Sequence, residues 1–479
     1  MVHTKKDRGS LQEARDQGTK VPNFFGKSER ARQYEFYGLI STHFASIPQH
    51  TSEGSIFVVW FGTTPRLTIS DPALIRQILV EKSEFFEKNE SPALVRELEG
   101  DGLLSLKGEK WAHHRKIIQP MFHTENLKLM VPIMGKSMEE ATEKWSEEMG
   151  LTSGGKMEVE VSDWYKKLVE EVIARATFGG SYQDGRPIFE LQAQQMVHAT
   201  QAYHQVFIPG YRLLPTKKNI NSRRLEKEVR KSLVNLIDGR MRNKDTAFHK
   251  DLLGLMINAT TTTTDDPELE ITVNDIVQEC KTIFFAGKHT TIQLLTWTTV
   301  LLAAHPQWQE LARHEVLTVC GSRDIPTEDH LPKLKLLSMI LNESLRLYPP
   351  AVAMIRRAKG DIRLGGGLHV LRGTELLIPI LAVHHDPALW GGDAHEFNPM
   401  RFAKGVAHAA KHPMAFLPFG LGTRRCIGQN LAILQAKLAI AIILRRFSFE
   451  LADDYSHSPS VLMLLHPQHG APMLFRKLN

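Results

Sequence analysis

A single cysteine lies between glycines and arginines near the C-terminal end of the chain, in the stretch Phe-Gly-Leu-Gly-Thr-Arg-Arg-Cys-Ile-Gly at residues 419–428. Glycines let the backbone approach the Cys426 sulfur, and the apolar helical run that follows offers free N–H groups and the positive end of a helix dipole. The neighbouring Arg424 and Arg425 also favour a thiolate over a thiol. A thiolate in these surroundings can bind haem iron as an axial ligand.

An ordinary buried cysteine in a glycine-rich turn is the alternative interpretation. The spacing Phe-x-x-Gly-x-Arg-x-Cys-x-Gly argues against it, because every fixed position is matched, at Phe419, Gly422, Arg424, Cys426 and Gly428. The stretch resembles the haem-binding loop of the cytochrome P450 superfamily. The resemblance implies that these residues bind haem b and that Cys426 is the ligand of its iron.

The composition is that of a globular protein, with 479 residues, 42% of them hydrophobic and 23% charged. Its cysteines, Cys280, Cys320 and Cys426, are widely spaced, provide no disulfide framework and suit a reducing compartment. We expect the first two to pack in the core. The net charge of +6 fits an anionic partner surface, such as an acidic protein or lipid headgroups. Basic residues are spread along the chain rather than clustered with aromatic residues, which argues against nucleic-acid binding.

The first 50 residues are polar and mixed, and they are predicted to be a leader without a recognisable membrane anchor or targeting sequence. No segment reaches the ~20 apolar residues that a membrane-spanning helix needs, so the chain as written is expected to be soluble, peripheral or truncated. The resemblance instead implies association with the cytosolic face of the endoplasmic-reticulum membrane. Residues 51–479 are expected to form one haem-thiolate monooxygenase domain.

Hydrophobic periodicity and turn residues predict the elements that position the cysteine. The β-branched and aromatic runs at residues 56–61 and 66–69, around a Gly-Thr-Thr-Pro turn, predict a β-hairpin. Residues from about 125 to 260 show a helical pattern, with helices at residues 126–145, 161–178 and 225–241, and further helices are predicted at residues 73–79 and 336–347. The apolar segment 207–215 contains two prolines and a glycine, and it fits either a packed loop or a lid or membrane-contacting patch.

A long helix is predicted from Thr272 to His305, with Thr272 and Asp275 as a capping box and Pro306 as its end. It is apolar nearly all round, so it should lie buried. Its middle carries small residues followed by hydroxyls, in the run Ala-Gly-Lys-His-Thr-Thr at residues 286–291.

The resemblance implies that dioxygen is activated beside this run. Ala286 and Gly287 would make room over the haem, and Thr290 would order water and relay protons. The alternative is that Thr290 only bonds back to a carbonyl one turn earlier. The family usually has an acid before this threonine, whereas this chain has His289. A histidine can carry protons near its unperturbed pKa of ~6.5 but offers no standing carboxylate, so the proton route stays open.

Further charged residues fit a supporting role. Glu343 and Arg346 lie on one face of a largely apolar helix, so we expect a buried ion pair, which needs a further partner. The resemblance implies that Arg401 is that partner and that this structural triad holds the haem loop. His384 and His385 are predicted to lie in an extended segment, where they point to opposite faces, which disfavours a metal site.

Several cations would bind the two haem propionates. Trp111 and Arg115 share a helical face, and the resemblance implies that they bind one propionate, with Arg356 and Arg424 as further donors.

The resemblance covers about residues 55–479 and implies a mainly α-helical cytochrome P450 fold with a small β subdomain. The strings at residues 103–111, 337–344 and 464–472 resemble plant hydroxylases that inactivate brassinosteroids by oxidising the side chain near C-26. The implied activity is hydroxylation of an unactivated C–H bond of a small apolar substrate. Electrons would come from NADPH through a separate cytochrome P450 reductase, whose acidic face would meet basic residues. The candidate contacts are Lys107, Lys110, Lys116 and Arg425.

Three alternatives stay open. The substrate can be another plant hormone or terpenoid, such as a cytokinin or gibberellin. The reaction can be isomerisation or dehydration of a peroxide, although relatives of that kind tend to lose the threonine found here at Thr290. The protein can also be a non-catalytic haem-thiolate sensor in which His289 marks lost oxygen activation.

Overall fold

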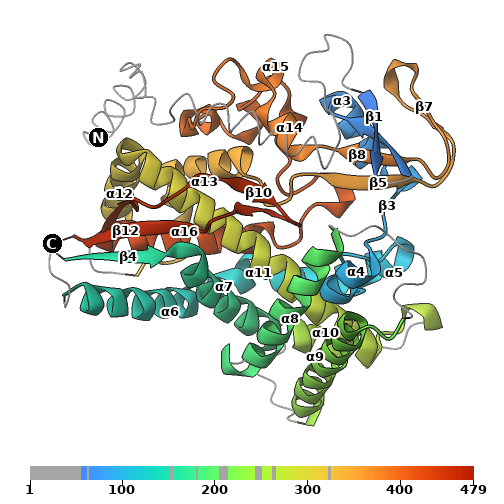
Figure 1. Cartoon of the computed structure of the whole chain (residues 1–479), viewed down its shortest axis with the longest axis horizontal. Helices are drawn as coiled ribbons and strands as arrows, with labels where there is room; N and C mark the ends of the chain where they lie inside the picture. Colours follow the sequence, from blue (N-terminus) through green and yellow to red (C-terminus); the bar gives the residue numbers. More distant parts are fainter. Residues whose placement is uncertain are drawn as a thin grey trace. The chain divides into compact units, whose positions relative to one another are not determined.

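Helices make up most of the fold, and the long helix α11 (Val273–Ala304) runs between the others (Figure 1). The computed structural model describes residues 56–61, 64–150, 155–179, 182–203, 214–242, 251–260, 266–321 and 325–478. The other helices are α3 (Pro72–Arg76), α4 (Ala93–Glu99), α5 (Gly108–Ile118), α6 (Thr124–Gly150), α7 (Val161–Phe178), α8 (Tyr182–Tyr203), α9 (Lys217–Arg242), α10 (Leu252–Thr260), α12 (Pro306–Cys320), α13 (Lys335–Leu347), α14 (Ile380–His385), α15 (Pro387–Trp390) and α16 (Gln429–Arg446).

The described strands form small sheets. They are β1 (Ile56–Phe61), β2 (Thr64–Ile69), β3 (Phe86–Lys88), β4 (Lys156–Glu160), β5 (Met354–Ala358), β6 (Ile362–Arg363), β7 (His369–Val370), β8 (Glu375–Ile378), β9 (Phe447–Leu451), β10 (Pro459–Val461), β11 (Leu465–Pro467) and β12 (Pro472–Lys477). The largest sheet has the order β1-β2-β8-β5-β3, and β4-β12-β9 forms a second one. The predicted hairpin is confirmed, because β1 and β2 pair antiparallel from Ile56 opposite Ile69 to Phe61 opposite Thr64.

The prediction for α11 is also confirmed. Thr272 Oγ1 accepts the Asp275 N–H at 3.1 Å, and the Asp275 carboxylate accepts the Thr272 N–H at 3.0 Å, which completes the capping box. Pro306 opens α12 directly after the helix ends. α11 packs against α4, α7, α13 and α16, so most of its side chains are buried. Cys280 and Cys320 are buried as expected.

Other predictions differ from the structure. Helix α8 lies within the stretch predicted to be helical but was given no bounds of its own, and α6 and α9 extend beyond the predicted ranges. The extended conformation predicted for His384 and His385 is wrong, because both end α14. Their rings lie 3.2 Å from Arg346 O and 2.8 Å from Leu347 O, so tertiary hydrogen bonds to the end of α13 stabilise this short helix.

Two predicted features lie outside the described residues. They are the leader at residues 1–50 and most of the apolar segment 207–215. Among the helices that are described, none combines the length and the apolar character needed to cross a membrane.

Candidate functional site

The loop that carries Cys426 has a backbone that only glycine permits at one point. The Cys426 N–H donates to Phe419 O at 2.8 Å, which closes the loop just before α16. Gly422 has a φ of +67°, and a Cβ placed there would lie 1.9 Å from Leu79 O. Both the left-handed conformation and this close approach exclude a side chain. The fixed glycine of the motif therefore lets the loop rest directly on the backbone that follows α3.

The thiol lies in a recess rather than on an outer surface. Solvent can reach the Cys426 side chain, but protein atoms surround it closely. This burial is the main influence on the pKa of the thiol and raises it. The backbone N–H groups of Gly428 and Gln429 and the charges of Arg115 and Arg425 act in the opposite direction and lower that pKa. Backbone donors and a flanking arginine thus face the sulfur, as the sequence predicts.

Arg424, which the sequence places beside the thiolate, lies over an aromatic ring instead. Its guanidinium carbon is 4.1 Å from the centroid of Trp111, and that of Arg115 is 5.4 Å from the same ring. Burial and the charges of Arg356 and Arg115 lower the pKa of Arg424 to about 10. The structure therefore brings together the four residues predicted to bind propionates.

A further cation, Lys88, lies with them, and no sequence pattern singles it out. Lys88 on β3 pairs with Arg356 on β5 in the register of the largest sheet. Burial and the charges of Arg356 and Arg424 lower the pKa of Lys88 to about 8, although Glu99 opposes them. No spacing signals this lysine, because only strand pairing brings it to the arginines.

The gathered charges fit an anionic ligand. Like charges that lower one another's pKa are unfavourable together unless anions lie among them. Haem offers two carboxylates and an iron for the thiolate, so the donor set at this site matches its chemistry.

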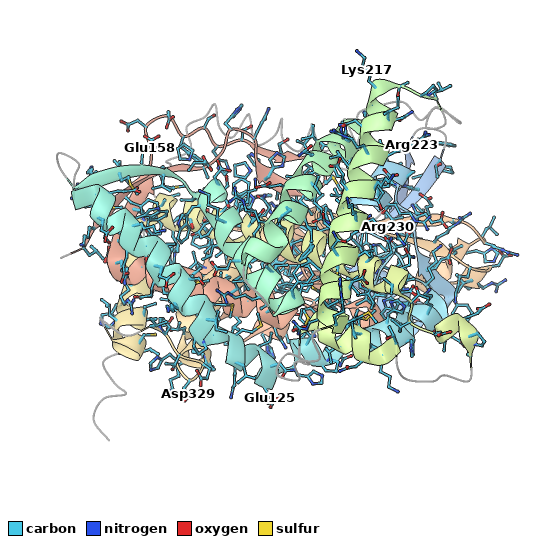
Figure 2. All side chains as sticks on the ribbon, turned by 90° about the horizontal axis from the view of Figure 1, so that it is seen from below. Glu125, Glu158, Lys217, Arg223, Arg230 and Asp329 are labelled. Atoms are coloured by element: carbon cyan, nitrogen blue, oxygen red, sulfur yellow. The ribbon has the colours of Figure 1, made fainter. Side chains whose placement is uncertain are left out.

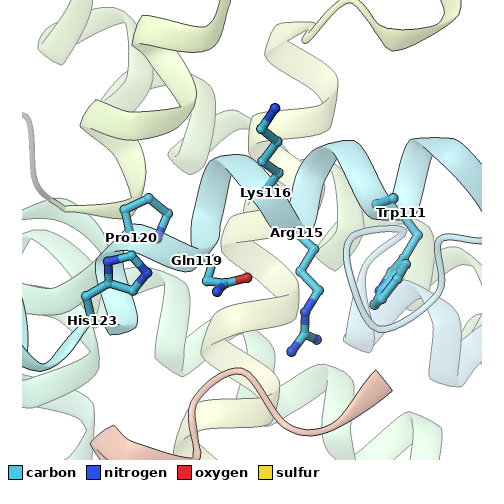
Figure 3. Close-up of a pocket in the computed structure, with 7 residues that line it drawn as sticks. Trp111, Arg115, Lys116, Gln119, Pro120 and His123 are labelled. Carbon is cyan, nitrogen blue, oxygen red and sulfur yellow. The ribbon is translucent and has the colours of Figure 1, made fainter. Parts of the chain in front are cut away.

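A cavity of about 330 Å³ lies along α5. It is lined by Trp111, Ala112, Arg115, Lys116, Gln119, Pro120 and His123 (Figure 3). Trp111 and Arg115 leave the helix on the same side, as their spacing predicts, and Lys116 leaves it on the other. Arg115 Nη2 also donates to Arg425 O at 2.9 Å, which ties α5 to the cysteine loop.

One stripe of α11 stays accessible in an otherwise buried stretch. Between residues 281 and 302, only Ala286, Gly287, His289, Thr290 and Gln293 are partly accessible. Four of them follow a spacing of three, one and three residues, so they share one face of the helix. This is the face on which the sequence predicts oxygen activation.

Gly287 lies on a different face of α11. Thr290 forms the hydrogen bond to a carbonyl one turn earlier that the sequence offered as an alternative to the proton relay. A Cβ on Gly287 would lie 2.6 Å from Ile173 Cδ1, so this glycine permits the close packing of α11 on α7. Thr290 Oγ1 donates to Ala286 O at 2.7 Å. Its oxygen can still accept a hydrogen bond, so the bond to the carbonyl does not remove it from a relay.

His289 is uncharged at neutral pH. Burial, with smaller effects from Lys288 and Lys166, lowers its pKa to about 3. Its ring centroid lies 5.5 Å from that of Phe285. The proton-carrying role expected from an unperturbed pKa therefore has no support from its surroundings.

The predicted triad forms. Glu343 and Arg346 are completely buried and bonded twice, at 2.7 Å each, and Arg401 Nε lies 3.3 Å from the same carboxylate. The Asn398 N–H donates to Glu343 as well, at 2.9 Å, and Asp393 binds Arg401 at 2.6 Å. The sequence did not indicate these two additional partners. Together with the backbone carbonyls that accept hydrogen bonds from Arg346 and Arg401, they satisfy the buried charges.

The four basic residues proposed for docking are not equivalent. Lys107 Nζ lies 3.2 and 3.4 Å from two glutamates, and Lys110 Nζ lies 2.8 Å from Asp275. Lys116 and Arg425 are exposed, and neither forms an ion pair with any described residue. Two of the four charges are thus neutralised within the chain.

Known proteins are similar to this chain in sequence and in fold. A family model described as "Cytochrome P450" matches residues 38–472. Cytochrome P450 734A1 of Arabidopsis thaliana is 61% identical over 435 residues, which cover 89% of this chain and 81% of the relative. Cytochrome P450 734A6 of Oryza sativa subsp. japonica is 57% identical, with 88% and 80% covered. The solved haem domain of cytochrome P450DA has the same fold, with a TM-score of 0.77, 24% identity and 95% of each chain covered.

Proposed function

The chain belongs to the cytochrome P450 family and is a haem-thiolate monooxygenase, and we propose that it hydroxylates a brassinosteroid side chain near C-26. The strings at residues 103–111, 337–344 and 464–472 support this substrate, because they resemble plant hydroxylases that inactivate these hormones. The observation that carries the chemistry is the Cys426 thiol, which faces backbone donors beside a cluster of four cations.

Each residue of that site has a part in holding haem b. Cys426 would ligate the iron, while Arg115, Arg356, Arg424 and Lys88 would neutralise the two propionates. Bound there, haem supplies the oxidising chemistry that inserts one oxygen atom of dioxygen into a C–H bond. Trp111 packs against two of the guanidinium groups and so fixes their direction.

Residues of α11 would manage water and protons beside the haem. Because Thr290 donates to Ala286 O, its oxygen lone pairs face outward as acceptors for water. An ordered water held in this way can pass protons from solvent to the reacting oxygen. The small side chain of Ala286 leaves space for it.

Partly accessible side chains around a separate buried apolar cluster would contact the substrate. Val95, Leu98, Ala199 and Phe285 form it, from α4, α8 and α11, with Leu104, Met196 and Met463 packed around them. Leu104, Met196 and Met463 are the partly accessible members and offer the apolar area that a steroid skeleton requires. Phe285 directly precedes the small residue Ala286 of the accessible stripe.

Members of this family take electrons from a reductase partner. For this chain we place a cytochrome P450 reductase that uses NADPH over Lys116 and Arg425, the two candidate basic residues outside internal ion pairs. Exposed charges of this kind accelerate encounter with an acidic partner.

The endoplasmic-reticulum membrane is the proposed location, and α9 supports it. This helix carries nine basic and three acidic side chains, and Figure 2 shows Lys217, Arg223 and Arg230 along it. Leu214 and Ile220, near its first turn, are 52% and 54% exposed. Basic and exposed apolar side chains together suit the headgroup region of an anionic membrane.

Turnover with a plant reductase and NADPH tests the proposal. The assay would present brassinosteroids, cytokinins, gibberellins and fatty acids and detect products by mass spectrometry. We expect a single oxygen added to a brassinosteroid side chain. Oxidation of another class would refute the substrate and keep the chemistry, and no product despite bound haem would favour a sensor.

A further inference from the structure

His289 is a polar side chain with free nitrogens at an apolar boundary. Its ring forms no hydrogen bond with any described residue, and neither nitrogen is among the fully buried unsatisfied atoms. It lies on the accessible stripe of α11, one residue before Thr290. Its nitrogens are therefore available to a molecule that occupies the space beside this stripe.

The surroundings of the His289 ring include an aromatic side chain and two positive charges. Phe285, which packs against it, belongs to the apolar cluster with Val95 and Leu98. Lys288 and Lys166 contribute positive charge, and the buried carboxylate of Glu170 lies 2.5 Å from Lys288 Nζ. That carboxylate is already bonded to an ammonium, so it does not supply the acid that is missing at residue 289.

A neutral imidazole in this position offers one N–H donor and one nitrogen acceptor. Buried polar groups are normally satisfied, so a ligand that leaves both nitrogens unpaired would bind less well than one that pairs them. A hydroxyl group can both donate and accept, which matches the ring. A carboxylate, the usual residue here in the family, would be costly to bury against the apolar cluster.

We infer that His289 is a substrate-recognition residue, which hydrogen-bonds a hydroxyl group of an otherwise apolar substrate and takes no part in the proton relay. The inference rests on the proposed function, because it places the oxidised molecule beside α11. It adds a chemical requirement: the substrate is an apolar alcohol. Its hydroxyl lies near His289 while its skeleton contacts Leu104, Met196 and Met463, which pack on the buried cluster that contains Phe285.

Equilibrium binding to the haem-loaded protein, followed by the change in its absorption spectrum, tests the inference without turnover. The ligands are a brassinosteroid with its side-chain hydroxyls and the same steroid without them. We expect His289→Leu to lower affinity for the hydroxylated steroid roughly tenfold and to leave that for the deoxy steroid within about twofold. His289→Asn, which keeps a donor and an acceptor, should restore affinity to within about threefold of the parent.

Two results would overturn the inference. Equal losses for both steroids in His289→Leu would mean that the side chain only fills space. Unchanged binding in both variants, with product per NADPH reduced in both, would mean that it carries protons.

Failure of the proposed substrate is a separate outcome. If the protein binds no brassinosteroid but binds another hydroxylated class of the panel, the same two variants are compared on that class and its deoxy counterpart. A larger loss of affinity for the hydroxylated molecule than for its deoxy counterpart would then support the inference, and equal losses would refute it. If every molecule that binds lacks a hydroxyl group, the inference is wrong whichever substrate proves correct.

Discussion

Substitution of Gly422 by alanine would meet two obstacles at one position, a left-handed backbone conformation and the close approach of a backbone carbonyl. Its φ of +67° costs a side-chain-bearing residue about 1–2 kcal/mol. In addition, the new Cβ would lie 1.9 Å from Leu79 O, so the backbone must move by roughly 1 Å or more to reach an ordinary contact. Forced repacking of this kind typically costs a further ~1–3 kcal/mol.

Gly366 provides the matched control. It has a φ of +66°, and no atom lies within 4 Å of an added Cβ. Gly366→Ala should therefore lower the free energy of unfolding by about 1–2 kcal/mol, and Gly422→Ala by about 2–5 kcal/mol. Urea unfolding measures both, and the carbon monoxide spectrum of the reduced protein reports whether the thiolate site survives. Equal losses in the two variants, with an intact spectrum, would refute the close approach at Gly422.

Three further perturbations probe the site and its surroundings. Cys426→Ala should abolish the thiolate-type carbon monoxide spectrum, whereas Cys320→Ala in the core should keep it; retention in the first would reject the ligand assignment. Thr290→Ala should keep haem and substrate binding but divert electrons to peroxide, and Thr290→Ser should restore product per NADPH. Unaltered coupling in Thr290→Ala would contradict the relay. Burial lowers the pKa of His384 to about 3 and that of His457 to about 4, so below ~6.5 the unfolded chain binds more protons than the folded one. Urea unfolding should thus show stability falling from pH 6.5 towards pH 4, by up to ~1.4 kcal/mol per pH unit for each histidine, and a flat profile would contradict their neutral state.

Local patterns predicted the features that depend on residues close in sequence. The capping box of α11 needs only Thr272 and Asp275, and the β1–β2 hairpin needs only alternating residues around a turn. The Cys426 loop is equally local, since Phe419 O closes it seven residues away. In such cases the physical requirement is visible in the spacing itself.

Features that depend on tertiary pairing were not predictable in this way. Lys88 reaches the arginines because β3 pairs with β5, which lies about 270 residues further along the chain. Gly287 fits the small-residue pattern of an oxygen pocket, but its partner is Ile173 on another helix. The histidines of α14 take a helical form because of carbonyls at the end of α13. A single sequence contains no signal for such partners.

The Cys426 loop depends on both local sequence and tertiary contacts. Its shape is local, but its position depends on atoms of distant segments: the backbone oxygen of Leu79, which lies against Gly422, and the Arg115 side chain, which donates to Arg425 O. Because the partner at Gly422 is a carbonyl, no change of the Leu79 side chain can relieve a clash there. The glycine must therefore be kept whatever residue stands opposite, which explains why a motif of fixed spacing can identify a site whose placement is otherwise tertiary.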